Sequence, residues 1–173
     1  VIIFAPICSG IAIFYMVSLR SCQKVAASGK YRFNTLIFTT AIVVGSIGVF
    51  VPEVLGLGNY EINQMLSANY ELSFLLLLMI IKIFVTALCI GFGFFGGVFG
   101  PALFVGAALG GVLAGLLMQV GFSSDYGTII ALATLAAVGS SVIGAPLTAV
   151  LIVLELTGSY QYALMALLSV TLC

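Results

Sequence analysis

The sequence predicts an all-α integral membrane protein built of many helices, some of them broken and tilted. Hydrophobic residues make up 63% of its 173 residues and charged residues only 6%, against roughly 25% charged in ordinary soluble domains. Five Lys and Arg with five Asp and Glu cannot cover the exterior of a soluble domain of this size. Because backbone groups that face lipid must be satisfied within helices or closed barrels, the long apolar runs indicate membrane helices.

The apolar runs predict helical segments in the following order: 1–19, 34–51, 73–91, 101–120, 128–143, 146–157 and 162–173. A helix needs about 20 apolar residues to cross a bilayer, so several of these segments are too short to cross alone. The chain begins and ends inside apolar runs, and residues 1–173 are therefore interpreted as one incomplete domain cut from a longer protein.

Four of the five basic residues lie together between the first two runs: Arg20, Lys24, Lys30 and Arg32. Lys and Arg in short loops are retained on the cytoplasmic side of a membrane. We therefore expect residues 20–33 to form a loop that faces the cytosol. The polar stretch from Glu53 to Glu71 is expected on the opposite side, as a connection without chemistry of its own.

Glycine and proline interrupt the later helices. Ten of the twenty glycines fall between Gly91 and Gly121, and Pro101 and Pro146 each stand where a new apolar run begins. Proline in the first turn of a helix loses no hydrogen bond. Transporter folds place such breaks at the bilayer midplane, where helix ends can face an ion.

The segment before the fourth run predicts a helix N-terminus that can bind an anion. Gly96 and Gly97 precede Val98, Phe99, Gly100 and Pro101 in the sequence GGVFGP. The first amides of a helix have no internal partner, and the helix dipole adds about half a positive charge at that end. Such partial charges allow both binding and release, whereas full charges bind too tightly. The alternative is that these glycines only allow close helix crossing.

A second helix start could complete such a site. Within residues 144–168 one helix is expected to end near Gly158, and Tyr160 opens the next. A tyrosine hydroxyl is a neutral donor that, together with the amides of Val98 and Phe99, could replace part of an anion's hydration shell. The alternative is that Tyr160 or Tyr162 anchors the chain at the membrane interface.

Lys82 interrupts the apolar run of residues 74–88 and is a candidate vestibule charge that attracts anions. Alternatively, its stem reaches an interface or its ammonium pairs with a carboxylate from a part of the protein outside this chain. Glu155 is interpreted as structural rather than as a proton relay. The four cysteines form no CxxC pair and no His accompanies them, so no metal site is predicted.

Two motifs now give a family resemblance. GGVFGP at residues 96–101 resembles the GxFxP signature of the CLC family of chloride channels and chloride/proton antiporters. APLTAVLIVLELTGSYQ at 145–161 resembles that family's late helix and its ion-coordinating tyrosine, and PEVLGLG at 52–58 fits as well. The resemblance covers essentially the whole chain, with the motifs in the family's order. Gly144, where members often carry a polar or basic residue, and Gly100, where many have Ala, are departures outside the proposed ligands.

The resemblance implies a homodimer with one pore per subunit and two inverted halves in each subunit, of which this chain is the second. The amides of Val98 and Phe99 and the hydroxyl of Tyr160 would line the central chloride site. The residues that would shape that site are Gly96, Gly97, Gly100 and Pro101. The family's serine filter and glutamate gate belong to the first half, so these residues alone do not separate a channel from an antiporter, or chloride from nitrate or fluoride.

Other classes of function are disfavoured by residues that the chain lacks. Zero His excludes a Ser/His pair and the single Asp125 excludes an aspartyl dyad, so no enzyme activity is predicted. A net charge of zero disfavours nucleic acid as a partner. The expected partners are the bilayer, chloride or a similar anion, protons in an antiporter, and a second copy; no cofactor is expected. A non-transporting helical scaffold is the alternative function.

Overall fold

A computed structural model describes residues 4–29, 33–56, 58–66, 70–121 and 125–173. All regular structure in these residues is helical, as predicted. The elements are α1 (Ala5–Ala27), α2 (Phe33–Phe50), the short 3₁₀ turn η1 (Pro52–Val54), α3 (Asn59–Leu66), α4 (Leu72–Gly91), α5 (Phe99–Gln119), α6 (Asp125–Ile143), α7 (Pro146–Thr157) and α8 (Tyr160–Leu172). Four of them, α1, α2, α4 and α5, are long and apolar enough to cross a membrane.

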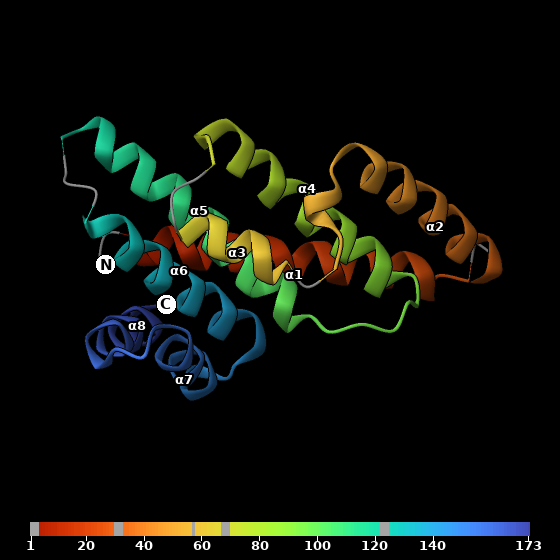
Figure 1. The fold of residues 1–173 in the computed structure, drawn as a ribbon. Helices are drawn as coiled ribbons and strands as arrows, with labels where there is room; N and C mark the ends of the chain where they lie inside the picture. The colour runs from red at the N-terminus through yellow and green to blue at the C-terminus, as the bar shows by residue number, and fades with distance from the viewer. Residues whose placement is uncertain (1–3, 30–32, 57, 67–69, 122–124) are drawn as a thin grey trace.

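Helix α5 lies at the centre of the bundle. It packs most extensively on α6 and also on α4, while α1 crosses behind them (Figure 1). Gly106 and Gly110 make the contact with α6 close: a Cβ at Gly106 would lie 2.7 Å from the Cα of Leu135, and one at Gly110 would meet the backbone of Ala131. Small residues let two membrane helices approach in this way.

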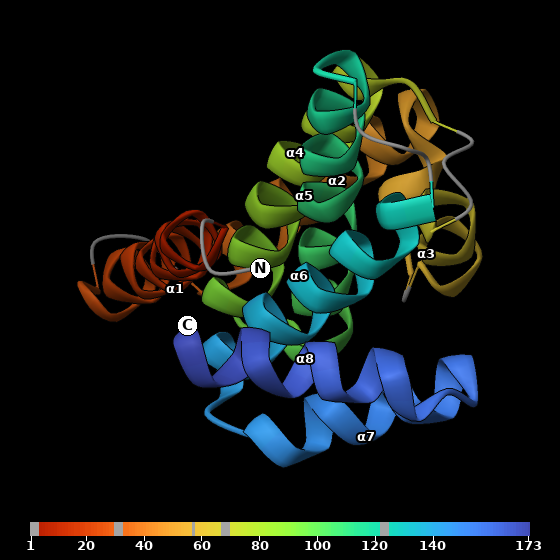
Figure 2. The ribbon, with the colours of Figure 1, turned by 90° about the vertical axis from the view of Figure 1, so that its left-hand side faces the viewer.

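The last two helices form an antiparallel hairpin on one side of the bundle. Figure 2 shows α7 and α8 side by side beneath α6, on which both of them pack. Pro146 stands in the first turn of α7, and Gly158 ends that helix in the left-handed conformation at φ 62°. The amide of Gly158 donates to the carbonyl of Leu154 at 2.7 Å. Both the proline start and the glycine end were predicted.

Several helix bounds differ from the predicted ones, and three differences concern the basic loop, the start of α5 and the polar stretch. Helix α1 continues through Arg20 and Lys24 to Ala27, so the predicted loop over 20–33 is wrong for these two residues. Arg and Lys are good helix formers, so they can continue a helix as readily as they can occupy a loop. Helix α5 begins at Phe99, two residues before Pro101, because the amide of Ala102 already donates to the Val98 carbonyl at 3.1 Å. The polar stretch 53–71 contains η1 and α3, which were not predicted.

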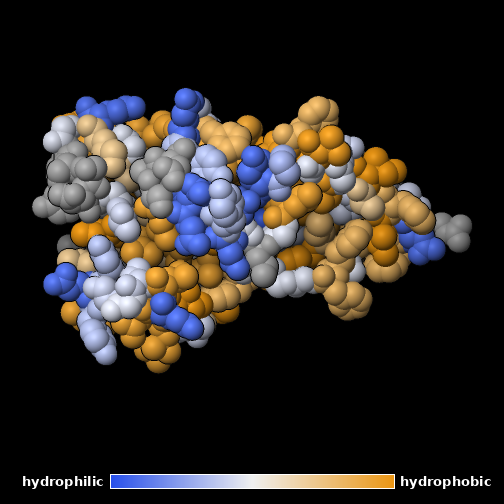
Figure 3. Space-filling view, viewed as in Figure 1, coloured by the Kyte–Doolittle hydropathy of each residue, from blue (hydrophilic) through white to orange (hydrophobic). Residues whose placement is uncertain are grey.

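Helix α3 was missed because its apolar content is low. Its eight residues bury only Ile62 and Met65, which lie three apart and therefore share one helix face. The hydrophilic residues gather over this helix in Figure 3, whereas apolar residues cover α2 and much of the α7–α8 hairpin. The exposed large apolar side chains on α2 include Phe38, Ile42 and Val49. A broad apolar surface of this kind is typical of a helix face that contacts lipid.

Candidate anion site at the start of helix α5

The start of α5 presents unpaired backbone donors. Val98 is its N-cap residue, and the amides of Val98, Phe99 and Gly100 have no acceptor among the described residues. A Cβ built on Gly96 or Gly97 would meet nothing within 4 Å, so space is open beside these amides. Free N–H groups at the positive end of a helix dipole can hold an anion without a charged side chain.

A tyrosine of α1, Tyr15, hydrogen-bonds the backbone carbonyl of Val98. The Tyr15 hydroxyl donates to the Val98 carbonyl oxygen at 3.3 Å, and the Tyr15 side chain is 0% exposed. Fixing the Val98 carbonyl also fixes the peptide that leads into α5. Sequence reasoning missed Tyr15, and the only signal for it was a hydroxyl-bearing aromatic in the middle of an apolar run.

Two cavities with no lining residue in common reach the GGVFGP segment. One, of about 210 Å³, is lined by Gly96, Gly97 and Pro101 together with Lys82. The other, of about 320 Å³, is lined by Val98 together with Arg20 and Gln23 of α1. Each cavity therefore joins the predicted site-shaping segment to one basic side chain.

Lys82 is buried inside the protein rather than extended to an interface. Its side chain is 2% exposed. The Nζ atom donates to the carbonyl of Val54 at 2.7 Å and to that of Gly56 at 2.9 Å. It also lies 4.6 Å from the centre of the Phe104 ring on α5, within the range of a cation–π interaction.

The interface alternative for Lys82 does not match this arrangement, whereas pairing with a carboxylate from outside this chain stays a prediction. Its partners are carbonyls of the PEVLGLG segment, not a carboxylate, and its stem does not reach the surface. Gly58 follows at φ 74° and packs its Cα against the Phe104 ring. Residues 52–56 and Gly58 therefore pack on α4 and α5, where Lys82 binds the carbonyls of Val54 and Gly56.

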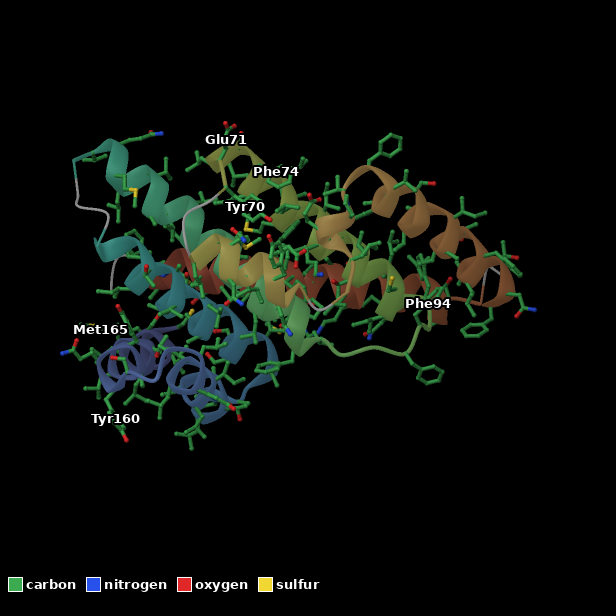
Figure 4. The ribbon with its side chains drawn as sticks, viewed as in Figure 1. Tyr70, Glu71, Phe74, Phe94, Tyr160 and Met165 are labelled. Atoms are coloured by element: carbon green, nitrogen blue, oxygen red, sulfur yellow. The ribbon has the colours of Figure 1, made fainter. Side chains whose placement is uncertain are left out.

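The structure does not bring Tyr160 to the start of α5. Tyr160 opens α8 as predicted, but its side chain is 77% exposed and points away from the bundle in Figure 4. Helix α8 packs mainly on α6 and α7. The Tyr160 hydroxyl has no hydrogen-bond partner among the described residues. Tyr162, one half-turn later, is partly buried against the core.

Of the remaining ionisable side chains that the structure describes, Cys89 lines the 210 Å³ cavity, and no Asp or Glu lines either cavity. Glu155 is exposed on α7. Tyr70, between α3 and α4, has a pKa raised above its ordinary value by partial burial and by the negative charges of Glu61 and Glu53. Acidic groups thus gather around α3. No group of His, Cys, Asp or Glu that could hold a metal ion occurs in the part of the chain described.

Comparisons with known proteins agree with the two motifs. A model of the voltage-gated chloride channel family matches residues 1–173. The H(+)/Cl(-) exchange transporter ClcA of Vibrio cholerae is 32% identical over 161 residues, which cover 90% of this chain and 34% of that relative. A putative chloride channel protein, ClcB-like, of Ralstonia nicotianae is 33% identical over 74% of this chain and 30% of its own length. The chain thus spans about a third of the length of the curated relatives it matches.

Proposed function

Because this chain belongs to the CLC family, the family of voltage-gated chloride channels, we propose that it forms part of a pathway that carries chloride or a similar small anion across the membrane. It is an integral, multi-pass membrane protein. The observation that carries the proposal is the start of α5, where unpaired amides adjoin open space and two cavities that each contain one basic residue. The relatives are named as exchange transporters and a channel, which supports transport rather than catalysis.

The anion is held by the backbone amides of Val98 and Phe99. Gly96, Gly97 and Gly100 carry no side chain that would cover these amides, and Pro101 stands within the first turn, where its missing N–H costs no helix bond. Helix-end amides carry partial charge, so the anion is stabilised without being trapped. Chloride is the substrate, and no cofactor takes part.

Lys82 supplies positive potential to this site from behind the 210 Å³ cavity that it lines. Two carbonyls accept hydrogen bonds from its ammonium group, and an ammonium has three donors. Its charge is therefore stabilised where it lies, and it raises the potential of the cavity without leaving segment 52–58. The cavity is the vestibule in this proposal.

The Tyr160 hydroxyl enters the proposal on the motif alone. Its place at the first turn of α8 after Gly158 matches the family pattern, and its hydroxyl is free to donate. For the hydroxyl to reach the amides of Val98 and Phe99, Tyr160 has to lie elsewhere than in this structure, where its side chain is 77% exposed. The role of the Tyr160 hydroxyl is therefore separable from that of the amides by mutation.

We further propose that the chain is the second of two inverted halves in a subunit and that the protein is a homodimer. Leu147 and Leu151 are 72% and 62% exposed, so α7 presents an apolar face that a helix of a second subunit could cover.

Residues 20–33 are proposed to lie on the cytosolic side because of their basic residues. Protons would be a second substrate if the protein is an exchanger.

A non-transporting scaffold is the competing function. A scaffold would also use close helix crossings, such as the one at which Gly106 of α5 meets α6. The scaffold function gives no role to the unpaired amides at the start of α5. Chloride and potassium flux from vesicles that contain the full-length protein separates the two, because a scaffold carries neither ion and the proposed pathway carries chloride only.

Val98→Pro tests the amide ligands directly. Proline removes the Val98 N–H, and the φ of Val98, −83°, is close to the value that proline requires. A hydrogen bond to a charged group contributes about 1.5–3 kcal/mol, so chloride affinity should fall roughly 10- to 100-fold. Calorimetric chloride titration of the full-length protein measures this change.

Val98→Ala is the matched control, because it shortens the same side chain and keeps the amide. Chloride affinity of Val98→Ala should stay close to that of the wild type, and circular dichroism should show both variants to be as helical as the wild type. Equal affinity in folded Val98→Pro and Val98→Ala would remove this amide from the site.

A further inference from the structure

The 320 Å³ cavity beside the start of α5 has a mouth that carries a single kind of charge. Helix α1 contributes Arg20 and Gln23, α5 contributes its N-cap residue Val98, and apolar residues of α1 and α6 form the rest. None of the described residues that line it is acidic. A concave space with only positive charge concentrates anions.

Arg20 is exposed and unengaged at this mouth. Its guanidinium forms no hydrogen bond or ion pair with any residue that the structure describes, although arginine offers five donors. Gln23, three residues on, lines the same cavity and adds neutral amide donors. Both therefore have donors available to a solute.

The two basic residues near α5 differ in what their charge can do. The Lys82 ammonium is buried and donates to two backbone carbonyls, whereas Arg20 lies at the solvent side of its cavity with no internal partner. A fixed, buried charge acts on a bound anion, while an exposed charge acts on the rate at which anions arrive. Arg20 is suited to the second role.

The floor of the Arg20 cavity is held in place from the other side. Tyr15 of α1 donates to the Val98 carbonyl, and Tyr15 and Arg20 lie on the same helix. Helix α1 thus carries both the hydroxyl that binds the Val98 carbonyl and the cation of the cavity that Val98 lines. One rigid helix therefore sets the distance between capture and binding.

We propose that Arg20 is the capture residue for anions approaching the start of α5 from the side of the α1 C-terminus, with Gln23 as a secondary donor. This inference rests on the proposed anion pathway and adds a specific route of access to it. Arg20 increases the rate of anion arrival and changes the affinity of the α5 amides little, because it is not one of their neighbours in the first turn. The other reading is that Arg20 only contacts lipid phosphates at the membrane surface, as basic residues near helix ends do.

The test compares Arg20→Gln with Lys24→Gln in the full-length protein. Lys24 lies on the same helix about one turn on, is exposed, and does not line the cavity. The two variants therefore lose the same charge about one helix turn apart on α1. Initial chloride efflux from phosphatidylcholine vesicles is measured at low and at high ionic strength, normalised to the amount of incorporated protein, together with calorimetric chloride affinity.

Arg20→Gln should lower the initial flux about three- to tenfold at low ionic strength, and the loss should shrink at high ionic strength as the charge is screened. Lys24→Gln should match the wild type, Arg20→Lys should recover most of the flux, and chloride affinity should stay unchanged in all three. Equal losses in Arg20→Gln and Lys24→Gln would indicate a general surface or lipid effect and overturn the inference. Wild-type flux in Arg20→Gln would overturn it as well, while leaving the proposed pathway intact. An absence of chloride flux in the wild type would instead overturn the proposed function itself.

Discussion

The starts of α5 and α8 are alike in sequence but differ in their surroundings. Each follows a glycine by one or a few residues and opens an apolar helix. The start of α5 is half-buried and packed against other helices, with Tyr15 on the Val98 carbonyl and Lys82 lining a cavity beside its first turn. The start of α8 lies at the surface, with Tyr160 77% exposed. A helix N-terminus becomes a candidate site through the elements packed around it, not through its own residues.

The largest expected effect comes from Lys82, the buried cation near the start of α5. Lys82→Met keeps the side chain's length but leaves the carbonyls of Val54 and Gly56 without their donor. Losing two hydrogen bonds to a charged group should lower the free energy of unfolding by about 2–5 kcal/mol. Thermal unfolding in detergent would reveal this as a clearly lower midpoint.

Lys24→Met is the control for that measurement, since Lys24 is exposed on α1 and surface changes usually stay within about 0.5 kcal/mol. If Lys82→Met unfolded at the same temperature as Lys24→Met, segment 52–58 would not depend on the lysine. The start of α5 would then be less supported than its contacts suggest.

An intermediate effect is expected at the start of α8. If Tyr160 donates to chloride, Tyr160→Phe should lower the affinity of the central site roughly tenfold, because a hydrogen bond to a charged group contributes about 1.5–3 kcal/mol and a neutral one about 0.5–1.5. Flux should change less than binding, because conduction depends on approach and exit as well as on affinity. Calorimetric titration of the full-length protein measures the affinity.

Tyr162→Phe is the matched variant on the same helix turn, and it should bind chloride as the wild type does. An unchanged affinity in Tyr160→Phe would mean that the two helix starts stay as separate as the structure places them. A loss confined to Tyr162→Phe would likewise remove Tyr160 from the site.

The smallest effect is expected from the neutral hydrogen bond behind the α5 start. Tyr15→Phe removes only the donor to the Val98 carbonyl and keeps the buried ring. It should lower the free energy of unfolding by about 0.5–1.5 kcal/mol, visible as a small drop in the thermal midpoint. Tyr60, which is 68% exposed, gives the comparison: a Tyr60→Phe midpoint as low as that of Tyr15→Phe would show that the buried bond adds nothing.

The helical architecture followed from the sequence because its causes are local. Long apolar runs, the proline in the first turn of α7 and the left-handed glycine after it act within a few residues. The motifs GGVFGP and APLTAVLIVLELTGSYQ indicated the family, and the match over residues 1–173 confirmed it. The short helix α3 escaped because eight residues with two buried positions give little periodic signal.

Contacts between distant segments were decided only by the tertiary structure. Lys82 and Val54 are 28 residues apart, and Tyr15 and Val98 are 83 apart, yet each pair is joined by a hydrogen bond. No spacing rule links residues so far apart, since their meeting depends on how whole helices pack. The motifs could therefore suggest Val98, Phe99 and Tyr160 as one site. Which of these residues lie together depends on how α5, α6 and the α7–α8 hairpin pack.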